Sequence, residues 1–227
     1  MLLFPACLVG LGHSEHWRPH LEHILSLVEE VALYSEDEFR TYLPRLLPLL
    51  QSSLSLKNIS TLSFTSTATN TKSPMRSLER TLACHDTLRG VLKPYLHIVV
   101  PSLCKLIAEL RELGAVATPW LLLSIRTLRR VFSNGSLLES QTHISFKIVH
   151  CLTGVITHVG TGGRSNSRDG QYPSGSGGSS TWNSPEVHEC VKTICQLAHQ
   201  LGTRFLVFDG LVRKCLKARG ISANLYI

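Results

Sequence analysis

Apolar residues recur along this chain at intervals of three and four positions. Leu21, Ile24, Leu25 and Val28 form one such series, and the same spacing returns in later segments as far as Leu201. This period places apolar side chains on one face of an α-helix, and the strict alternation typical of a half-buried strand is absent. The pattern predicts eight helices, over residues 18–33, 37–54, 75–91, 93–113, 118–133, 140–158, 185–201 and 203–219.

Residues that favour helix starts and ends stand at the borders of these ranges. Ser184 is suited to cap a helix, with Pro185 in the first turn and Glu186 near the positive end of the helix dipole. Glycines adopt the left-handed conformation in which many helices end. Three glycines follow the last apolar positions of predicted helices: Gly114, Gly202 and Gly220.

The second helix of several predicted pairs opens with a related motif. An aromatic residue is followed by Leu and by a Pro within an apolar stretch, as in Phe39, Leu43 and Pro44, and again over 93–103. Segment 17–25 shows the same pattern of an aromatic residue, a polar residue, Leu and an apolar pair, and segment 205–212 is a degenerate fourth copy. Antiparallel helix pairs with a period of about 40 to 47 residues are typical of HEAT-type repeats, in which each pair buries its apolar face against its neighbours. The predicted fold is therefore all-α, an α-solenoid of HEAT-type antiparallel helix pairs.

Two segments interrupt the helical pattern. Residues 51–74 are rich in Ser and Thr, and residues 160–184 are rich in Gly and Ser. We predict two disordered insertions, and the second has no hydrophobic period that could bury it. Gly160 to Gly163 lack the preceding strand, the following helix and the Lys of a phosphate-binding loop, which favours a linker. The repeats are then expected over 1–50 and 75–159, with a terminal repeat over 185–227.

The segments that carry the motif are also similar to a known family. The run EDEFRTYLP at 36–44 closely resembles a helical repeat in the HEAT region of target of rapamycin (TOR) serine/threonine protein kinases. WRPHL at 17–21, YLHIVVP at 95–101 and CQLAHQLG at 195–202 agree with that region in the same order. The last of these resembles a repeat that precedes the FAT domain of the family. One helical element of the family pattern, between Leu27 and Phe39, is missing here or fused into one helix.

The resemblance implies a non-catalytic scaffold. In the TOR family this region helps to build the kinase dimer and receives the regulatory subunit that recruits substrates. The implied partners are therefore that subunit and a second copy of the parent kinase, in nutrient and growth signalling. The implied location is cytoplasmic, peripheral to endomembranes through the parent complex. A free-standing HEAT-repeat adaptor of the karyopherin or phosphatase-scaffold type is the alternative, and the sequence downstream would distinguish the two.

The residue patterns of a kinase active site are not evident in the sequence. Such a site needs a phosphate-binding Lys, a catalytic-loop Asp with its Asn, and a metal-binding Asp before a Phe-Gly pair. Asp209-Gly210 follows Phe208 instead of preceding a Phe, and we expect it to form a turn between helices. We assign no catalytic residue and no cofactor, and the family's catalysis would lie C-terminal to this chain.

Histidines and cysteines provide the remaining candidates for chemistry. His13, His16, His20 and His23 crowd together, but Pro19 marks a helix start and leaves too few ligands on one face for zinc. We therefore predict no metal site and interpret these histidines as surface or capping residues. The seven cysteines are odd in number and lack CxxC pairs, which favours reduced, buried thiols in a reducing compartment. Cys190 and Cys195 are five positions apart and are expected to pack in the core.

Positive charge exceeds negative charge, with 23 Lys and Arg against 16 Asp and Glu, a net charge of +7. One basic group consists of Arg204, Arg213, Lys214, Lys217 and Arg219, and a second of Lys105, Arg111, Arg126, Arg129 and Arg130. A nucleic-acid partner would require exposed aromatic residues or a recognition helix, and we expect the aromatic residues on buried faces. Solvated ridges are predicted instead, with an acidic protein or a phosphoinositide surface as the alternatives. No apolar run reaches the roughly 18 residues of a transmembrane helix.

Overall fold

The structure, a computed structural model, describes residues 20–34, 39–56, 74–133, 142–158 and 184–222. Within these ranges there are eight α-helices and no strand: α2 (Leu21–Tyr34), α3 (Phe39–Ser53), α5 (Pro74–Thr87), α6 (Leu96–Glu112), α7 (Thr118–Phe132), α8 (Thr142–His158), α9 (Pro185–Leu201) and α10 (Leu206–Lys217). Each helix corresponds to one of the predicted ranges. The all-α prediction is confirmed.

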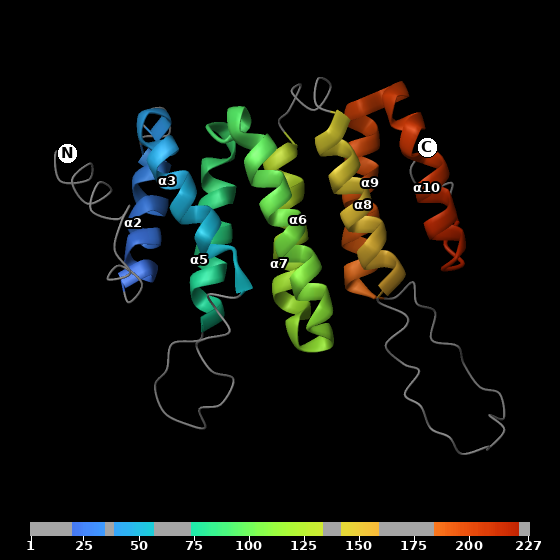
Figure 1. Cartoon of the computed structure of the whole chain (residues 1–227), viewed down its shortest axis with the longest axis horizontal. Helices are drawn as coiled ribbons and strands as arrows, with labels where there is room; N and C mark the ends of the chain where they lie inside the picture. Colours follow the sequence, from blue (N-terminus) through green and yellow to red (C-terminus); the bar gives the residue numbers. More distant parts are fainter. Residues whose placement is uncertain (1–19, 35–38, 57–73, 134–141, 159–183, 223–227) are drawn as a thin grey trace, which may run out of the picture.

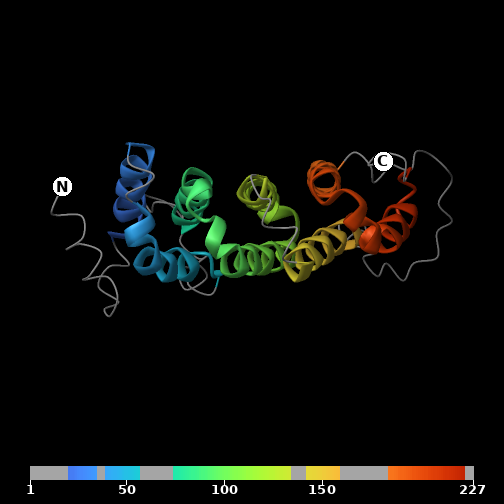
Figure 2. The same cartoon turned by 90° about the horizontal axis from the view of Figure 1, so that it is seen from above.

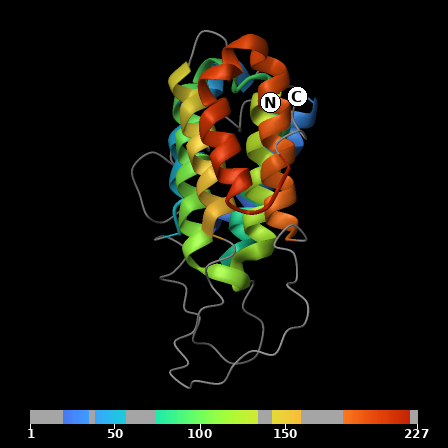
Figure 3. The same cartoon turned by 90° about the vertical axis from the view of Figure 1, so that its right-hand side faces the viewer.

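The helices alternate between two layers (Figures 1 and 2). The first layer holds α2, α5, α7 and α9 side by side, and the second holds α3, α6, α8 and α10. Neighbouring helices are in contact throughout the first layer, as are α6, α8 and α10 in the second, while α6 and α8 also pack across the layers against α7 and α9. Viewed from the C-terminal end, the helices of each layer follow one behind another (Figure 3). This stacking confirms the solenoid architecture.

One apolar core runs between the layers, from Leu25 in α2 to Leu216 in α10. Residues at the starts of three second-layer helices contribute to it. Phe39 is the first residue of α3, Leu96 is the first of α6, and Phe205 immediately precedes α10. All three side chains are buried in this core. Each such burial contributes about 1.5 to 3 kcal/mol, so these residues anchor the starts of α3, α6 and α10.

The predicted caps and helix ends are present. The hydroxyl of Ser184 accepts a hydrogen bond from the backbone N–H of Val187 at 3.5 Å, and Pro185 occupies the first turn of α9. Three glycines have positive φ angles, Gly114 at 69°, Gly202 at 54° and Gly220 at 67°. The ranges predicted over 75–91, 93–113 and 203–219 were too long as α-helices, because the terminal turns Leu88–Gly90, Lys93–Tyr95 and Gly202–Phe205 are 3-10 helices. A single tight turn has too few residues for its period to differ from that of an α-helix.

The predicted insertions fall largely outside the described residues. Of 51–74, only 51–56 and 74 are described, and α3 continues to Ser53, in agreement with the helix predicted over 37–54. Of 160–184, only Ser184 is described. No individual helix in the described ranges has the length and hydropathy needed to cross a membrane. One pair, Met75–Gly90 with Lys93–Glu112, meets both criteria only when taken together, and the two members are bent by 115°.

Candidate interaction surface

The basic residues predicted to cluster near the C-terminus lie on and beside α10. Arg213 forms an ion pair with Asp209 one turn earlier, with 2.6 Å between Nε and Oδ2. Arg219 donates a hydrogen bond to the carbonyl oxygen of Thr157, near the end of α8. The other members of the group are exposed: Arg204, Lys214 and Lys217. Part of this charge therefore contributes to contacts within the fold, and part faces solvent.

The second predicted basic group does not form one surface. Arg129 and Arg126 of α7 contact the carboxylate of Glu189 in α9, with N–O distances of 2.9 and 3.4 Å. Arg130, also in α7, contacts the carboxylate of Asp86 in α5 at 2.6 Å. These ion pairs join neighbouring helices of the first layer. The three arginines therefore neutralise nearby carboxylates and do not form a continuous basic ridge.

The other two members of that group, Lys105 and Arg111, line a cleft between α6 and α8. The cleft is open to solvent and has a volume of about 450 Å³. Phe146, Lys147 and His150 of α8 line its opposite wall. None of the described residues that line the cleft is acidic. Two facing helices thus present three cations and an aromatic ring around one recess.

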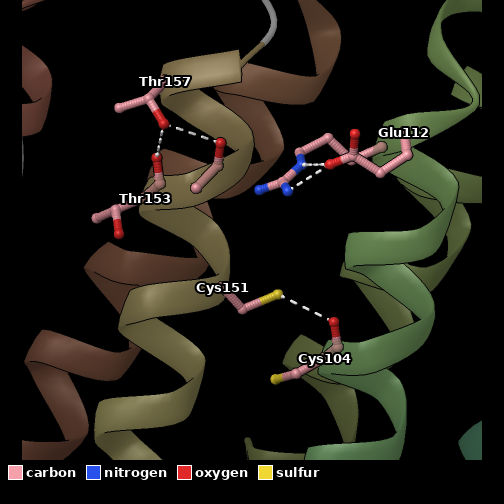
Figure 4. Close-up of polar contacts among 7 residues, drawn as sticks. Cys104, Glu112, Cys151, Thr153 and Thr157 are labelled. Carbon is pink, nitrogen blue, oxygen red and sulfur yellow. Dashed lines mark hydrogen bonds and ion pairs between the residues drawn. The ribbon is translucent and has the colours of Figure 1, made fainter.

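Small side chains form the floor of this cleft and let the two helices approach each other. The thiol of Cys151 donates to the carbonyl oxygen of Cys104 at 3.5 Å (Figure 4), and the thiol of Cys104 donates to the carbonyl oxygen of Lys147 at 3.9 Å. A Cβ at Gly154 would lie only 2.8 Å from Nη1 of Arg111, so glycine leaves room for that side chain. A hydrogen bond with Cys151, together with burial, raises the pKa of Cys104 well above its usual range. The thiol of Cys104 therefore stays protonated and behaves as a small apolar group.

The two carboxylates of α6 beside the cleft contact two of its three cations, Lys105 and Arg111. Glu109 accepts a hydrogen bond from the backbone N–H of Leu56 at 3.3 Å, and its other oxygen lies 3.9 Å from Nζ of Lys105. Glu112 lies further along α6 and accepts two hydrogen bonds from Arg111, which lower the pKa of Glu112 (Figure 4). The sequence of α8 contains no Asp or Glu over its whole length. Positive charge therefore exceeds negative charge around the cleft.

Phe146 is the aromatic group at the mouth of the cleft, and it is 52% exposed. Its ring stacks on the ring of His150, with 6.1 Å between the two centroids. The centroid of the Phe208 ring of α10 lies 6.4 Å from that of Phe146. We expected the aromatic residues on buried faces, and Phe146 contradicts that expectation. The reason lies in the helical period, because α8 buries a stripe that includes Ile144 and Ile148, and position 146 falls outside it.

A second recess, of about 390 Å³, lies beyond the end of α6, and Arg111 lines both recesses. Glu186 of α9 faces it and accepts hydrogen bonds from the hydroxyl of Thr118 at 2.7 Å and from that of Ser184. Burial opposes ionisation of this carboxyl, yet the two hydrogen bonds hold the pKa of Glu186 below its ordinary value. Glu186 thus links the first turns of α7 and α9, and its acceptor oxygens are already used.

The structure corrects the interpretation of Asp209-Gly210. The two residues do not form a turn between helices but lie inside α10, where Asp209 pairs with Arg213. A Cβ added at Gly210 would meet nothing within 4 Å, so no close contact requires glycine at this place. A single Gly in a helix interior costs about 1 kcal/mol relative to Ala, which weakens a helix without ending it.

The candidates His20, His23, Cys190 and Cys195 are not among the residues that line the cleft. His20 and His23 are exposed at the start of α2, and His13 and His16 lie outside the described residues. Over the part of the chain that the structure describes, no three His, Cys, Asp or Glu side chains come together as metal ligands. Cys190 is buried in the core, as predicted, and burial raises its pKa well above the usual range.

Comparison with protein-family models, with curated proteins and with solved structures finds no match to this chain. The residues of the cleft between α6 and α8 therefore carry the functional argument. Lys105 and Arg111 belong to a basic group that the sequence revealed, whereas Lys147 and Phe146 were missed. The signal that could have identified them is the absence of Asp and Glu from 142–158. The arrangement suits a ligand that carries negative charge beside an apolar group.

Proposed function

We propose that this chain is a non-catalytic helical scaffold segment of a TOR-like serine/threonine protein kinase. It would mediate protein–protein assembly, through dimer and regulatory-subunit contacts, in nutrient and growth signalling. One observation carries the proposal. Two of the segments that resemble the TOR HEAT region open α3 and α6, and the degenerate copy opens α10, in the second layer, whereas the segment over 195–202 lies at the end of α9 in the first layer. Repeats of one family place the same motif at the same structural position.

The outward faces of α2 and α10 support a role in assembly. Leu206 and Val207 of α10 are 71% and 79% exposed, and Leu211 is exposed beside them. On α2, Leu33 and Tyr34 are exposed in the same way. Contiguous apolar side chains on the surface of a soluble protein mark contact sites. A scaffold acts by offering such surfaces and requires no catalytic group in this segment.

The length of the native polypeptide tests the proposal. Full-length message that encodes residues 1–227 is sequenced, and the native polypeptide is sized with an antibody against α6 and α8. We expect a polypeptide far larger than 25.1 kDa, with a kinase region after this segment. A stable native product near 25.1 kDa would overturn the proposal in favour of a free-standing helical adaptor.

A further inference from the structure

We propose that the cleft between α6 and α8 binds a short acidic segment of a partner protein. An apolar side chain of that segment inserts beside Phe146, and its carboxylates contact Lys105 and Lys147. The inference rests on the scaffold function proposed above, to which it adds one binding site and the chemistry of one partner.

The shape of the cleft fits an anchor residue. Its volume of about 450 Å³ falls in the range of roughly 300 to 1,000 Å³ found for pockets that hold compact ligands. Pro101, Ala108 and the ring of Phe146 give it apolar walls, and Cys104 and Cys151 also line it. A ring that is half exposed beside a recess gains contacts when an apolar side chain fills that recess. The cleft is too small to receive a folded domain.

The charges at the rim fit carboxylates. Lys105 and Lys147 stand on opposite walls, on helices that face each other. The side chain of Lys105 is 70% exposed, and its contact with Glu109 is long at 3.9 Å, so this ion pair contributes little and can be exchanged. Lys147 has no carboxylate partner among the described residues. Acidic residues on either side of the anchor would therefore meet one cation each, which favours encounter and fixes the register of the segment.

The distribution of charge favours a protein segment over a nucleic acid. A nucleic acid is bound by a track of cations along its phosphates, with exposed aromatic rings that stack on bases. Here the cations flank a small apolar recess, and Phe146 stacks on His150 instead of standing free. Arg129 and Arg130, which could extend a track, pair with carboxylates in the other layer.

A binding assay with a defined probe tests the inference. The probe is a short fluorescein-labelled peptide of Glu and Asp with two central Leu residues, and fluorescence anisotropy measures its binding to the 227-residue chain. We expect the double variant Lys105→Glu, Lys147→Glu to weaken binding by about tenfold or more. Phe146→Ser should weaken it about fivefold, because the anchor loses its aromatic wall.

A matched control separates the cleft from general charge. The double variant Lys192→Glu, Lys217→Glu makes the same charge change at exposed lysines outside the cleft, and it should alter affinity by less than about twofold. Far-ultraviolet circular dichroism of each variant confirms that the helices are retained. Equal losses in the two double variants, or no saturable binding of the probe, would overturn the inference.

Two further probes decide the class of ligand. A peptide with Ser in place of both Leu residues should bind several times more weakly. The inference fails if this Ser peptide binds as well as the Leu peptide and a single-stranded oligonucleotide binds more tightly than either. If Phe146→Ser also leaves the affinity for the oligonucleotide unchanged, the surface recognises polyanions in general. None of these results depends on the size of the native polypeptide. A long kinase-bearing polypeptide whose cleft binds no probe would leave the scaffold proposal standing and reject only the cleft.

Discussion

Replacing Glu189 with Gln tests how strongly the contact between α7 and α9 stabilises the fold. The Glu189 side chain is 10% exposed and that of Arg129 is 18% exposed, with 2.9 Å between Nη1 and Oε2. Arg126 adds a second contact at 3.4 Å. Glu189→Gln keeps the shape of the side chain and removes its charge, so Arg129 would keep a neutral partner in a mostly buried place.

The expected loss follows from burial. A hydrogen bond to a charged group contributes about 1.5 to 3 kcal/mol, and breaking a fully buried ion pair costs about 3 to 5 kcal/mol. Arg126 is 47% exposed and can be solvated, so we expect a loss of about 2 kcal/mol in the free energy of unfolding. Asp209→Asn is the matched control, because it makes the same chemical change in the more exposed pair with Arg213. That variant should lose about 0.3 to 0.5 kcal/mol.

Urea unfolding followed by circular dichroism measures both losses. At about 1 M salt the Debye length falls to about 3 Å, which should abolish most of the effect of Asp209→Asn and leave most of that of Glu189→Gln. Equal losses in the two variants, or an unchanged midpoint for Glu189→Gln, would refute the reasoning that burial sets the strength of this contact.

Other predictions concern single residues. Burial lowers the pKa of His85, and its hydrogen bond with the Thr81 carbonyl opposes this shift. When the pH falls through 6.5, the ordinary pKa of histidine, His85 therefore takes up a proton in the unfolded chain but not in the folded chain. The free energy of unfolding should therefore fall below about pH 6.5, by at most about 1.4 kcal/mol per pH unit, and His85→Gln should flatten this slope in urea unfolding at several pH values. Gly210→Ala should stabilise α10 by about 1 kcal/mol, whereas Gly202→Ala should destabilise the protein by a similar amount because φ at Gly202 is 54°, and thermal unfolding of both variants checks the opposite signs. Burial raises the pKa of Cys84 to about 12, so iodoacetamide at about pH 8 should alkylate it about a thousandfold more slowly than a free thiol, as mass spectrometry would measure. Labelling of Cys84 at the rate of an exposed thiol would contradict its burial.

The helices could be predicted because local signals coincide with the packing that the fold requires. The glycine at 202 stands where α9 ends, and Ser184 caps the start of the same helix. Apolar spacing identified the core face of each helix, which is why Leu25 and Ile194 are both buried. The last turns were less predictable, because a 3-10 turn and an α-helical turn follow almost the same apolar pattern over three residues.

The cleft could not be predicted from local signals, because it depends on which helices become neighbours. Lys105 and Lys147 are 42 positions apart in the sequence and meet only because α6 and α8 are adjacent in the second layer. Conversely, Arg129 and Arg130 look like an exposed basic run in the sequence. They are neutralised by Glu189 and Asp86, which come from the helices on either side.

The main contacts of every helix are with helices near it in the chain, and this has a consequence for synthesis on the ribosome. Once α5 has emerged, its partner α2 is already available, and the same holds for α7 with α5 and for α9 with α7. A nascent chain of this kind can therefore fold progressively from its N-terminal side, since no helix waits for a distant partner. The apolar faces that lack a partner are then confined to the last one or two helices to emerge, as for α2 and α3 before α5 is complete.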